Sequence, residues 1–391
     1  MRARVPLVIS ILLAGLASVA AQVETAWTWA GLEILGNHHV ARSEIEKLIP
    51  IPIGEAYHRG NAPFWSEGCA RVLRQFDFAS VDCGDRPLRV YDGHKAYLIV
   101  DIVERGREDL LKLRKPPSGS VPFGSGRMLE LNAELETRTT KAAMAGHGYS
   151  ESGDRGYLSY SDPNGVNEDL SPLVEELARL VPQYRENLLE ILRREKSADR
   201  RREAAILLNW AGGDLEELLR RTIPLLDDPD DGVRNNLSRF MIQFVGQVNS
   251  GRLRRRLIDV FIDEIGRPSH GDRNKGLYNL LFIAKAWPVE RVQMRRRGGE
   301  AIRYLAENSI LFNVQGPAQE LLALIEGKRQ GFFGDPPVPQ PQGGHPLSKT
   351  ILQRPSGSHE NGASGPSKNP LQPAATATLP RRSGCSRRGW S

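Results

Sequence analysis

The stretch Gly31-Leu-Glu-Ile-Leu-Gly-Asn37 decides how the first part of this chain is expected to fold. Its large apolar residues predict a strand, and the closing Gly36-Asn37 pair is typical of a turn. The next segment, Ala41–Ile49, has apolar residues at helical spacing and ends before Pro50, which cannot continue a helix. We therefore expect a strand that leads through a tight turn into a helix.

Three more elements are expected before residue 106. A second helix over Phe64–Phe76 carries an apolar stripe, and a short strand follows over Phe78–Cys83. Residues Gly84–Gly93 should connect it to a last strand over Ala96–Glu104. Because that last strand is apolar on both faces, we expect it at the centre of a sheet. The predicted order is βααββ.

These residues resemble the POTRA family over roughly residues 27–105. The resemblance rests on Gly36-Asn37, Gly54, Phe78-Ala-Ser-Val81 and Ile102-Val-Glu104, which occur in the family's order. Two features depart from the pattern: the loop from Glu55 to Pro63 is long, and Gln75 stands where the family usually has a glycine. The alternative is an unrelated βααββ domain with a generic packing role.

The resemblance implies a docking function. POTRA domains leave an edge strand free, and an extended chain can pair with such an edge by β-augmentation. The matching edge residues here are Ala79, Ser80, Val81, Asp82 and Cys83. Because the family occurs in outer-membrane assembly, transport and division proteins, the implied partners are envelope or outer-membrane proteins.

The first 21 residues read as an export signal. Arg2 and Arg4 precede a short apolar run, and Val19-Ala20-Ala21 is a small-residue cleavage site. We expect the mature chain to begin at Gln22, to have no transmembrane span, and to be periplasmic or peripherally associated with the outer membrane. An uncleaved membrane anchor is the alternative.

Cysteine usage fits either of two states. Cys69 and Cys83 fall inside the first module, and export would allow them to form a disulfide. Two buried free thiols would be equally ordinary. Cys385 has no evident mate in the sequence.

Composition divides the rest of the chain. Residues 107–170 are rich in Pro, Gly and Ser and read as a linker with one helix near Met128–Met144. Residues 171–330 show only helical patterns. The tail, 331–391, is basic, rich in Pro, Gly and Ser, and has few large apolar residues, so we expect it to be disordered. The expected fold class is α+β, with a small βααββ domain and an all-α region.

The helical region resembles HEAT repeats over about residues 173–326. An acidic turn and a following helix, Asp227-Asp-Pro-Asp-Asp-Gly-Val-Arg234, are echoed at Asp199–Ala205 and Asp272–Leu277. From Arg202 to Arg234 to Arg273 the steps are about 32 and 39 residues, close to that repeat length. An Asp, for instance Asp231, should cap the next helix, and the Arg should pair with an Asp of a neighbouring repeat. An irregular helical bundle is the alternative.

The charge suggests a further partner class. The net charge is +6, and arginines cluster at 200–202, 254–256 and 295–297. They are either solvated helix faces or contacts for an anionic surface. Export argues against nucleic acid as that partner.

Motifs for chemistry are weak. His38, His39, His58 and His94 lack acidic or cysteine partners at ligand spacing, so no metal site is expected, and no cofactor motif occurs. The run 148–153 departs from a nucleophile elbow. The chain therefore reads as an exported, non-enzymatic adaptor or scaffold. The rivals are an envelope hydrolase with a site in 107–170 and an anchored division-type protein.

Overall fold

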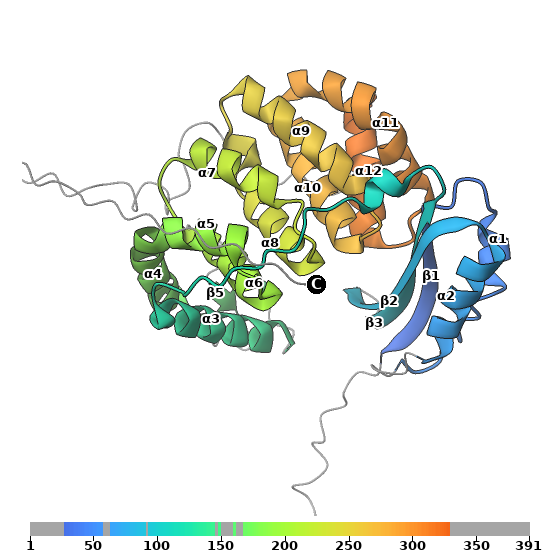
Figure 1. The fold of residues 1–391 in the computed structure, drawn as a ribbon, viewed down its shortest axis with the longest axis horizontal. Helices are drawn as coiled ribbons and strands as arrows, with labels where there is room; N and C mark the ends of the chain where they lie inside the picture. The colour runs from blue at the N-terminus through green and yellow to red at the C-terminus, as the bar shows by residue number, and fades with distance from the viewer. Residues whose placement is uncertain are drawn as a thin grey trace, which may run out of the picture. The chain divides into compact units, whose positions relative to one another are not determined.

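The computed structural model describes residues 27–57, 63–90, 93–144, 148–149, 159–161 and 167–328 (Figure 1). Within them the chain has a mixed α+β fold, which confirms the expected fold class at that level. The export signal expected over 1–21, the tail expected over 331–391 and Cys385 lie outside the described residues.

The first part of the chain forms a three-stranded sheet with two helices. Its elements, in order, are β1 (Thr28–Leu35), α1 (Arg42–Glu46), α2 (Pro63–Gln75), β2 (Phe78–Val90) and β3 (Gly93–Glu104). The strands lie in the order β1-β3-β2, with β1 parallel and β2 antiparallel to β3. Figure 1 shows α1 and α2 on one side of this sheet and α10 to α12 on the other. The central place of β3 explains why it is apolar on both faces.

Strand β2 is longer than the sequence suggested. We expected it to end at Cys83, with Gly84–Gly93 as a connection, but it continues to Val90 and pairs with β3 along its whole length. Pro87 lies inside this extension, opposite Ala96. A proline is tolerated there because β2 is an edge strand, on which one side needs no hydrogen-bond donor.

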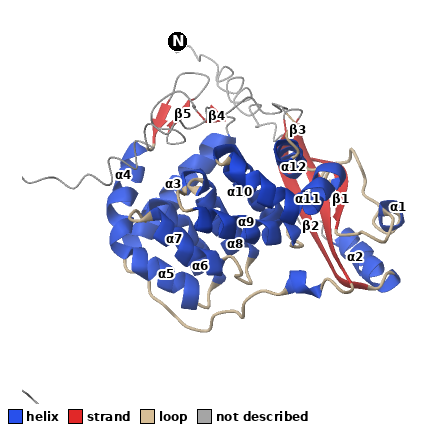
Figure 2. Ribbon diagram, turned by 90° about the horizontal axis from the view of Figure 1, so that it is seen from above, coloured by secondary structure: helices blue, strands red, loops and turns tan. Residues whose placement is uncertain are grey.

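The segment expected to be a linker is fastened to the helices. After the 3-10 turn η1 (Glu108–Leu111), an extended stretch runs along the helical region (Figure 2). The N–H of Arg114 donates to Asp227 O at 2.9 Å, and the N–H of Val121 donates to Glu195 Oε2 at 2.8 Å. Helix α3 (Gly126–Met144) follows, and then three short strands: β4 (Gly148–Tyr149), β5 (Ser159–Ser161) and β6 (Asn167–Asp169).

Helices make up the remainder. They are α4 (Ser171–Leu180), α5 (Arg185–Arg194), α6 (Ala198–Leu207), α7 (Leu215–Thr222), α8 (Asp231–Ile242), α9 (Gly251–Gly266), α10 (His270–Ala286), α11 (Arg291–Asn308) and α12 (Phe312–Ile325). Helices α6, α8, α10 and α12 pack in succession, and their apolar side chains form one core with those of α9 and α11. Among the described residues, no helix is both long and apolar enough to cross a bilayer.

Four of these helices begin with the same local arrangement of residues. Each has a Ser or Asp N-cap and an Arg four residues later, whose side chain reaches an acidic residue of the next layer. The pairs of cap and arginine are Ser197 and Arg201, Asp230 and Arg234, Ser250 and Arg254, and Ser269 and Arg273.

The acidic partners link successive layers. Arg201 donates to both carboxylate oxygens of Asp228, at 2.9 and 2.8 Å, and Arg234 Nε donates to Asp272 Oδ2 at 2.9 Å. One detail of the prediction was wrong. The cap of α8 is Asp230, not the exposed Asp231, because the side chain of Asp230 is the one that accepts the N–H of Val233.

Candidate docking edge

The outer edge of β1 is closed by the chain itself. The N–H of Trp29 donates to Glu55 O at 3.0 Å, and the carbonyl of Trp29 accepts the N–H of Gly54 at 2.8 Å. The N–H of Tyr57 donates to Trp27 O at 2.7 Å, and the guanidinium of Arg42 donates to the carbonyl of Leu32. These bonds satisfy outward backbone groups of Trp27, Trp29 and Leu32, which this edge would otherwise present to a new strand.

The outer edge of β2 is different. Over the ranges that the structure describes, β2 pairs with β3 and with no other strand. All five residues expected at a free edge, Ala79 to Cys83, lie on β2. Asp82 is exposed and the other four are half-buried. The pairing register shifts between Phe78 and Ser80, so Ala79 sits at an irregularity and the regular ladder begins at Ser80.

Pro87 shows which backbone groups of β2 point outward. Because proline has no N–H, its place in a strand is one where the N–H would face away from the ladder. Direction alternates along a strand, and the register is regular from Ser80 to Val90. The outward N–H groups are therefore those of Val81, Cys83 and Asp85. Those of Ser80 and Asp82 point toward β3.

The two faces of β2 differ in chemistry. Val81 and Cys83 pack toward the core beneath α1 and α2. Asp82 and Arg86, on the opposite face, are exposed, whereas Leu88 on that face packs against the core of the helical region. A strand placed beside β2 would therefore meet apolar surface on one side and charged surface on the other.

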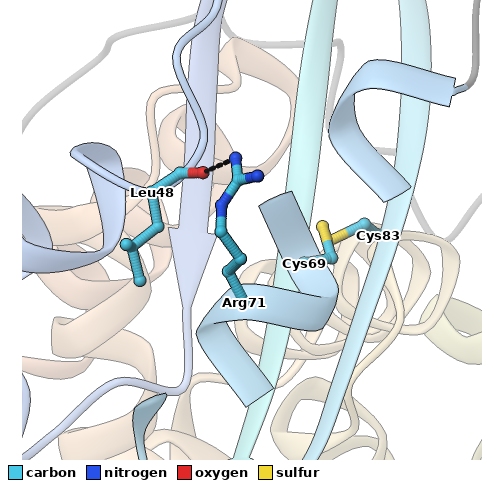
Figure 3. The surroundings of a disulfide bond; sticks show 4 residues. All are labelled: Leu48, Cys69, Arg71 and Cys83. Atoms are coloured by element: carbon cyan, nitrogen blue, oxygen red, sulfur yellow. Dashed lines mark hydrogen bonds between the residues drawn. A yellow bond between two sulfur atoms is a disulfide. The ribbon is translucent and has the colours of Figure 1, made fainter. Parts of the chain in front are cut away.

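A disulfide fixes β2 from the α2 side. Cys83 is bonded to Cys69 of α2, with the two Cα atoms 6.5 Å apart (Figure 3). Helix α2 is held in turn by Arg71, whose Nη2 donates to the carbonyl of Leu48 at 2.8 Å. A bridge closing a loop of this length stabilises a fold by about 3 kcal/mol.

Buried polar contacts fix the sheet from the other side. On β3, Asp101 pairs with Arg273 of α10. The central strand thus supplies to α10 the acidic partner that the next helical layer supplies to α6, α8 and α9. On β1, Glu33 accepts hydrogen bonds from Ser309 Oγ at 2.6 Å and from the N–H of Ile310 at 2.7 Å. Burial raises the pKa of both carboxyls, and their polar partners oppose that rise.

The turn after β1 is part of the same attachment. The N–H of Gly36 donates to Tyr304 Oη of α11 at 2.8 Å. Gly36 has a φ of 88°, and a Cβ there would lie 2.0 Å from the carbonyl oxygen of Ile102. Only glycine fits this turn, since a side chain would be strained and would clash with β3. The glycine that marked the turn in the sequence thus also places the sheet against α11.

A basic group of side chains lies near Arg86 of β2. Burial and then the charges of Arg239 and Arg86 lower the pKa of Lys275 to about 8. Burial, followed by the charge of Arg86 among others, also lowers the pKa of His270, to about 3. Neither Arg86 nor Lys275 pairs with a carboxylate of the described ranges, although Lys275 Nζ contacts Asn274 Oδ1 at 2.7 Å. This region therefore favours an anionic group.

Sequence reasoning missed the residues that hold the sheet in place. Glu33 and Asp101 were the available signal, because each is a charged residue inside an otherwise apolar strand. Their partners Ser309 and Arg273 lie 276 and 172 residues away, so no local pattern pairs them with these carboxylates.

The residues considered for metal binding or catalysis do not come together in the described part of the chain. His39 Nδ1 lies 2.6 Å from Glu104 Oε2 and joins the turn after β1 to the end of β3. No group of three or more metal-binding side chains occurs among the residues described, which exclude His58. Of the run 148–153, only Gly148 and Tyr149 are described, and they form β4.

Comparisons with known proteins give no relative. No family model matches the chain, and neither the curated proteins nor the solved structures contain a significant match.

Proposed function

We propose that this protein is an exported docking protein that takes up an extended segment of an envelope protein at the outer edge of β2. The observation that carries the proposal is the outward backbone of β2, where Val81, Cys83 and Asp85 direct N–H groups away from β3. An incoming strand can pair with these groups by β-augmentation.

The POTRA-like reading of the first module is part of this proposal. Its support is the βααββ order, with the strand after α2 at a sheet edge. The HEAT-like reading of the helices is likewise a proposal. Its support is the repeated cap and arginine of α6, α8 and α10, which link each layer to the next. In this reading the helices are a scaffold that holds the sheet and offers a second surface, and the chain is not an enzyme.

The chemistry of β2 specifies the segment that it would take up. Alternate residues of the segment would lie beside Val81 and Cys83 and should be apolar. The residues between them would lie beside Asp82, Gly84 and Arg86. An acidic side chain opposite Arg86 would form a favourable cross-strand pair and would lie near the positive charge at Lys275. The expected ligand is therefore an alternating apolar and polar segment with at least one carboxylate.

Export is supported by two features. The sequence pattern of residues 1–21 is that of a cleaved signal, and the disulfide between Cys69 and Cys83 would persist in an oxidising compartment. A periplasmic place, free or against the outer membrane, follows from these and from the envelope partners proposed. Sequencing the native N-terminus tests cleavage, which should leave Gln22 first.

Peptide selection tests docking at β2. A displayed library of ten-residue peptides is selected against the purified protein, and the best synthetic peptide is titrated against Val81→Pro and Val81→Ala. Val81→Pro removes an outward donor and should weaken binding at least tenfold, whereas Val81→Ala keeps that donor and should bind within about threefold of the wild type. Both variants should remain folded by circular dichroism.

Two outcomes would reject the proposal. One is equal binding of the peptide by the proline and alanine variants, because main-chain pairing at Val81 would then contribute nothing. The other is selection of peptides without alternating apolar and polar residues, because such peptides would not use β2 as a pairing partner.

A further inference from the structure

Helices α9 and α11 lie side by side and run in the same direction. Contacts between them advance together along both helices. Arg254 Nε lies 3.0 Å from Glu290 Oε1, just before α11 begins, and Gln293 Nε2 donates to Asp259 Oδ1 at 3.0 Å. Further along, Arg297 Nε lies 3.6 Å from the same oxygen of Asp259. The first halves of the two helices are therefore direct neighbours (Figure 1).

The arginines of the two triplets on these helices, 254–256 and 295–297, differ in whether they contact other side chains of the protein. Arg254 is used inside the protein, since it pairs with Glu290 and its guanidinium lies 4.0 Å above the ring of Trp287. Arg297 contacts Asp259. Five other arginines of the two helices are exposed and pair with no acidic side chain in the part of the chain that is described: Arg252, Arg255, Arg256, Arg295 and Arg296.

Two apolar side chains stand beside these arginines. Val289 and Val292 are 71% and 63% exposed, the two highest values for a large apolar residue within the described ranges. Val292 and Arg296 are one helical turn apart, so they share a face of α11. Val289 lies next to Glu290, the partner of Arg254, and so near the start of α9.

We propose that this α9–α11 surface, the five exposed arginines with Val289 and Val292, binds an anionic lipid membrane peripherally. Guanidinium groups pair well with phosphate, and each basic residue near an anionic membrane adds to binding. Exposed apolar side chains among basic ones are typical of surfaces that rest in the headgroup region, where the apolar groups leave water. An acidic protein partner would account for the arginines but gives no reason for two exposed valines.

The proposal is independent of docking at β2, because the residues belong to different elements. It assigns the chain a membrane contact that is made by helices α9 and α11. The charge supplies most of the attraction, so binding should fall as salt rises. The valines supply the part that salt does not screen.

Vesicle sedimentation tests the proposal. Purified protein is mixed with phosphatidylglycerol–phosphatidylethanolamine vesicles or with phosphatidylcholine vesicles at low salt. We expect binding to the anionic vesicles only. Arg256→Glu with Arg296→Glu should lower the partition coefficient at least about twentyfold, since one arginine near such a surface contributes on the order of fivefold. Val289→Ser with Val292→Ser should reduce the binding that survives at high salt.

A matched control separates the surface from net charge. Arg74→Glu with Arg105→Glu makes the same charge change at exposed positions of α2 and at the end of β3, and it should bind nearly as the wild type does. Equal loss in both double variants would overturn the proposal, because only total charge would matter. Equal binding to phosphatidylcholine would also overturn it. Binding to poly-glutamate but not to anionic vesicles would assign the surface to an acidic protein instead.

Discussion

The two edge strands of the sheet, β1 and β2, both present backbone N–H and C=O groups on their outer side. Within the described residues, the chain pairs with such groups on β1 and places no strand on the outer side of β2. At β1 the chain folds back over residues 54–57 and satisfies the outer groups of Trp27 and Trp29 with its own backbone. At β2 the described chain supplies no such strand. The β2 edge instead carries Asp82, Arg86 and Pro87, which are features that discourage pairing between identical edges. This fold therefore closes part of the β1 edge with its own backbone, whereas the described residues place no strand on the outer side of β2.

Both edge strands pair with the central strand β3, and the first prediction concerns the ion pair between Asp101 of β3 and Arg273 of α10. Replacing Arg273 by Met should destabilise the protein by about 3–5 kcal/mol, because Asp101 would remain buried without its partner. Urea unfolding measures the loss. Adding Asp101→Leu to the variant should recover a substantial part of the stability, because no buried charge would then lack a partner.

Arg303→Met is the control for this prediction. Arg303 pairs with Glu326 at 2.8 Å, but its side chain is 51% exposed, so its loss should destabilise the protein far less than the loss of Arg273. Equal costs for Arg273→Met and Arg303→Met would mean that the contact with Asp101 does not hold the sheet.

The sequence predicted the individual strands and helices better than it predicted the contacts that hold the sheet against the helices. Strand β1 and its turn follow from the apolar run that ends at Gly36-Asn37, and the helix before β2 follows from its apolar stripe. The extension of β2 was missed because Gly84 and Pro87 are typical of a turn when read locally. Only pairing with β3 makes that segment a strand.

The candidate site was predicted in part. The resemblance placed Ala79 to Cys83 on an edge strand, where they lie. It could not give the direction of each N–H, which depends on the register of Pro87 against Ala96. Nor could it identify Arg273 as the partner of Asp101, since the two lie 172 residues apart. The cap followed four residues later by an arginine was visible in the sequence and would have located all four of these arginines.

The second prediction concerns a buried carboxyl of the helical region, Glu264 of α9, and involves neither edge of the sheet. Burial, and then the nearby charge of Asp272, raise the pKa of Glu264 to about 8, and Ser238 Oγ donates to this carboxyl. The folded-state pKa lies above the unfolded value, so the stabilisation is complete below about pH 4.5 and is lost as the pH rises toward 8. The wild type should therefore lose on the order of 4 kcal/mol from this group over that range.

Glu264→Gln should remove this pH dependence, because an amide does not ionise. Thermal unfolding between pH 5 and pH 9 measures it, and Glu307→Gln, at an exposed position of α11, is the control. The peptide affinity of β2 should not change in either variant at pH 7. A wild-type protein with the same pH profile as Glu264→Gln would contradict the prediction.

The third prediction tests the difference between the edges directly and involves no substitution. Amide hydrogen exchange in the free protein should be slow at Trp29, Gly54 and Tyr57, because their N–H groups are bonded within the chain. Exchange at Val81 and Asp85 should be faster by roughly a hundredfold or more, since their N–H groups face outward. A bound peptide should slow Val81 and Asp85 and leave the β1 edge unchanged. Slow exchange at Val81 in the free protein would show that part of the chain itself covers β2, and the two edges would then be alike.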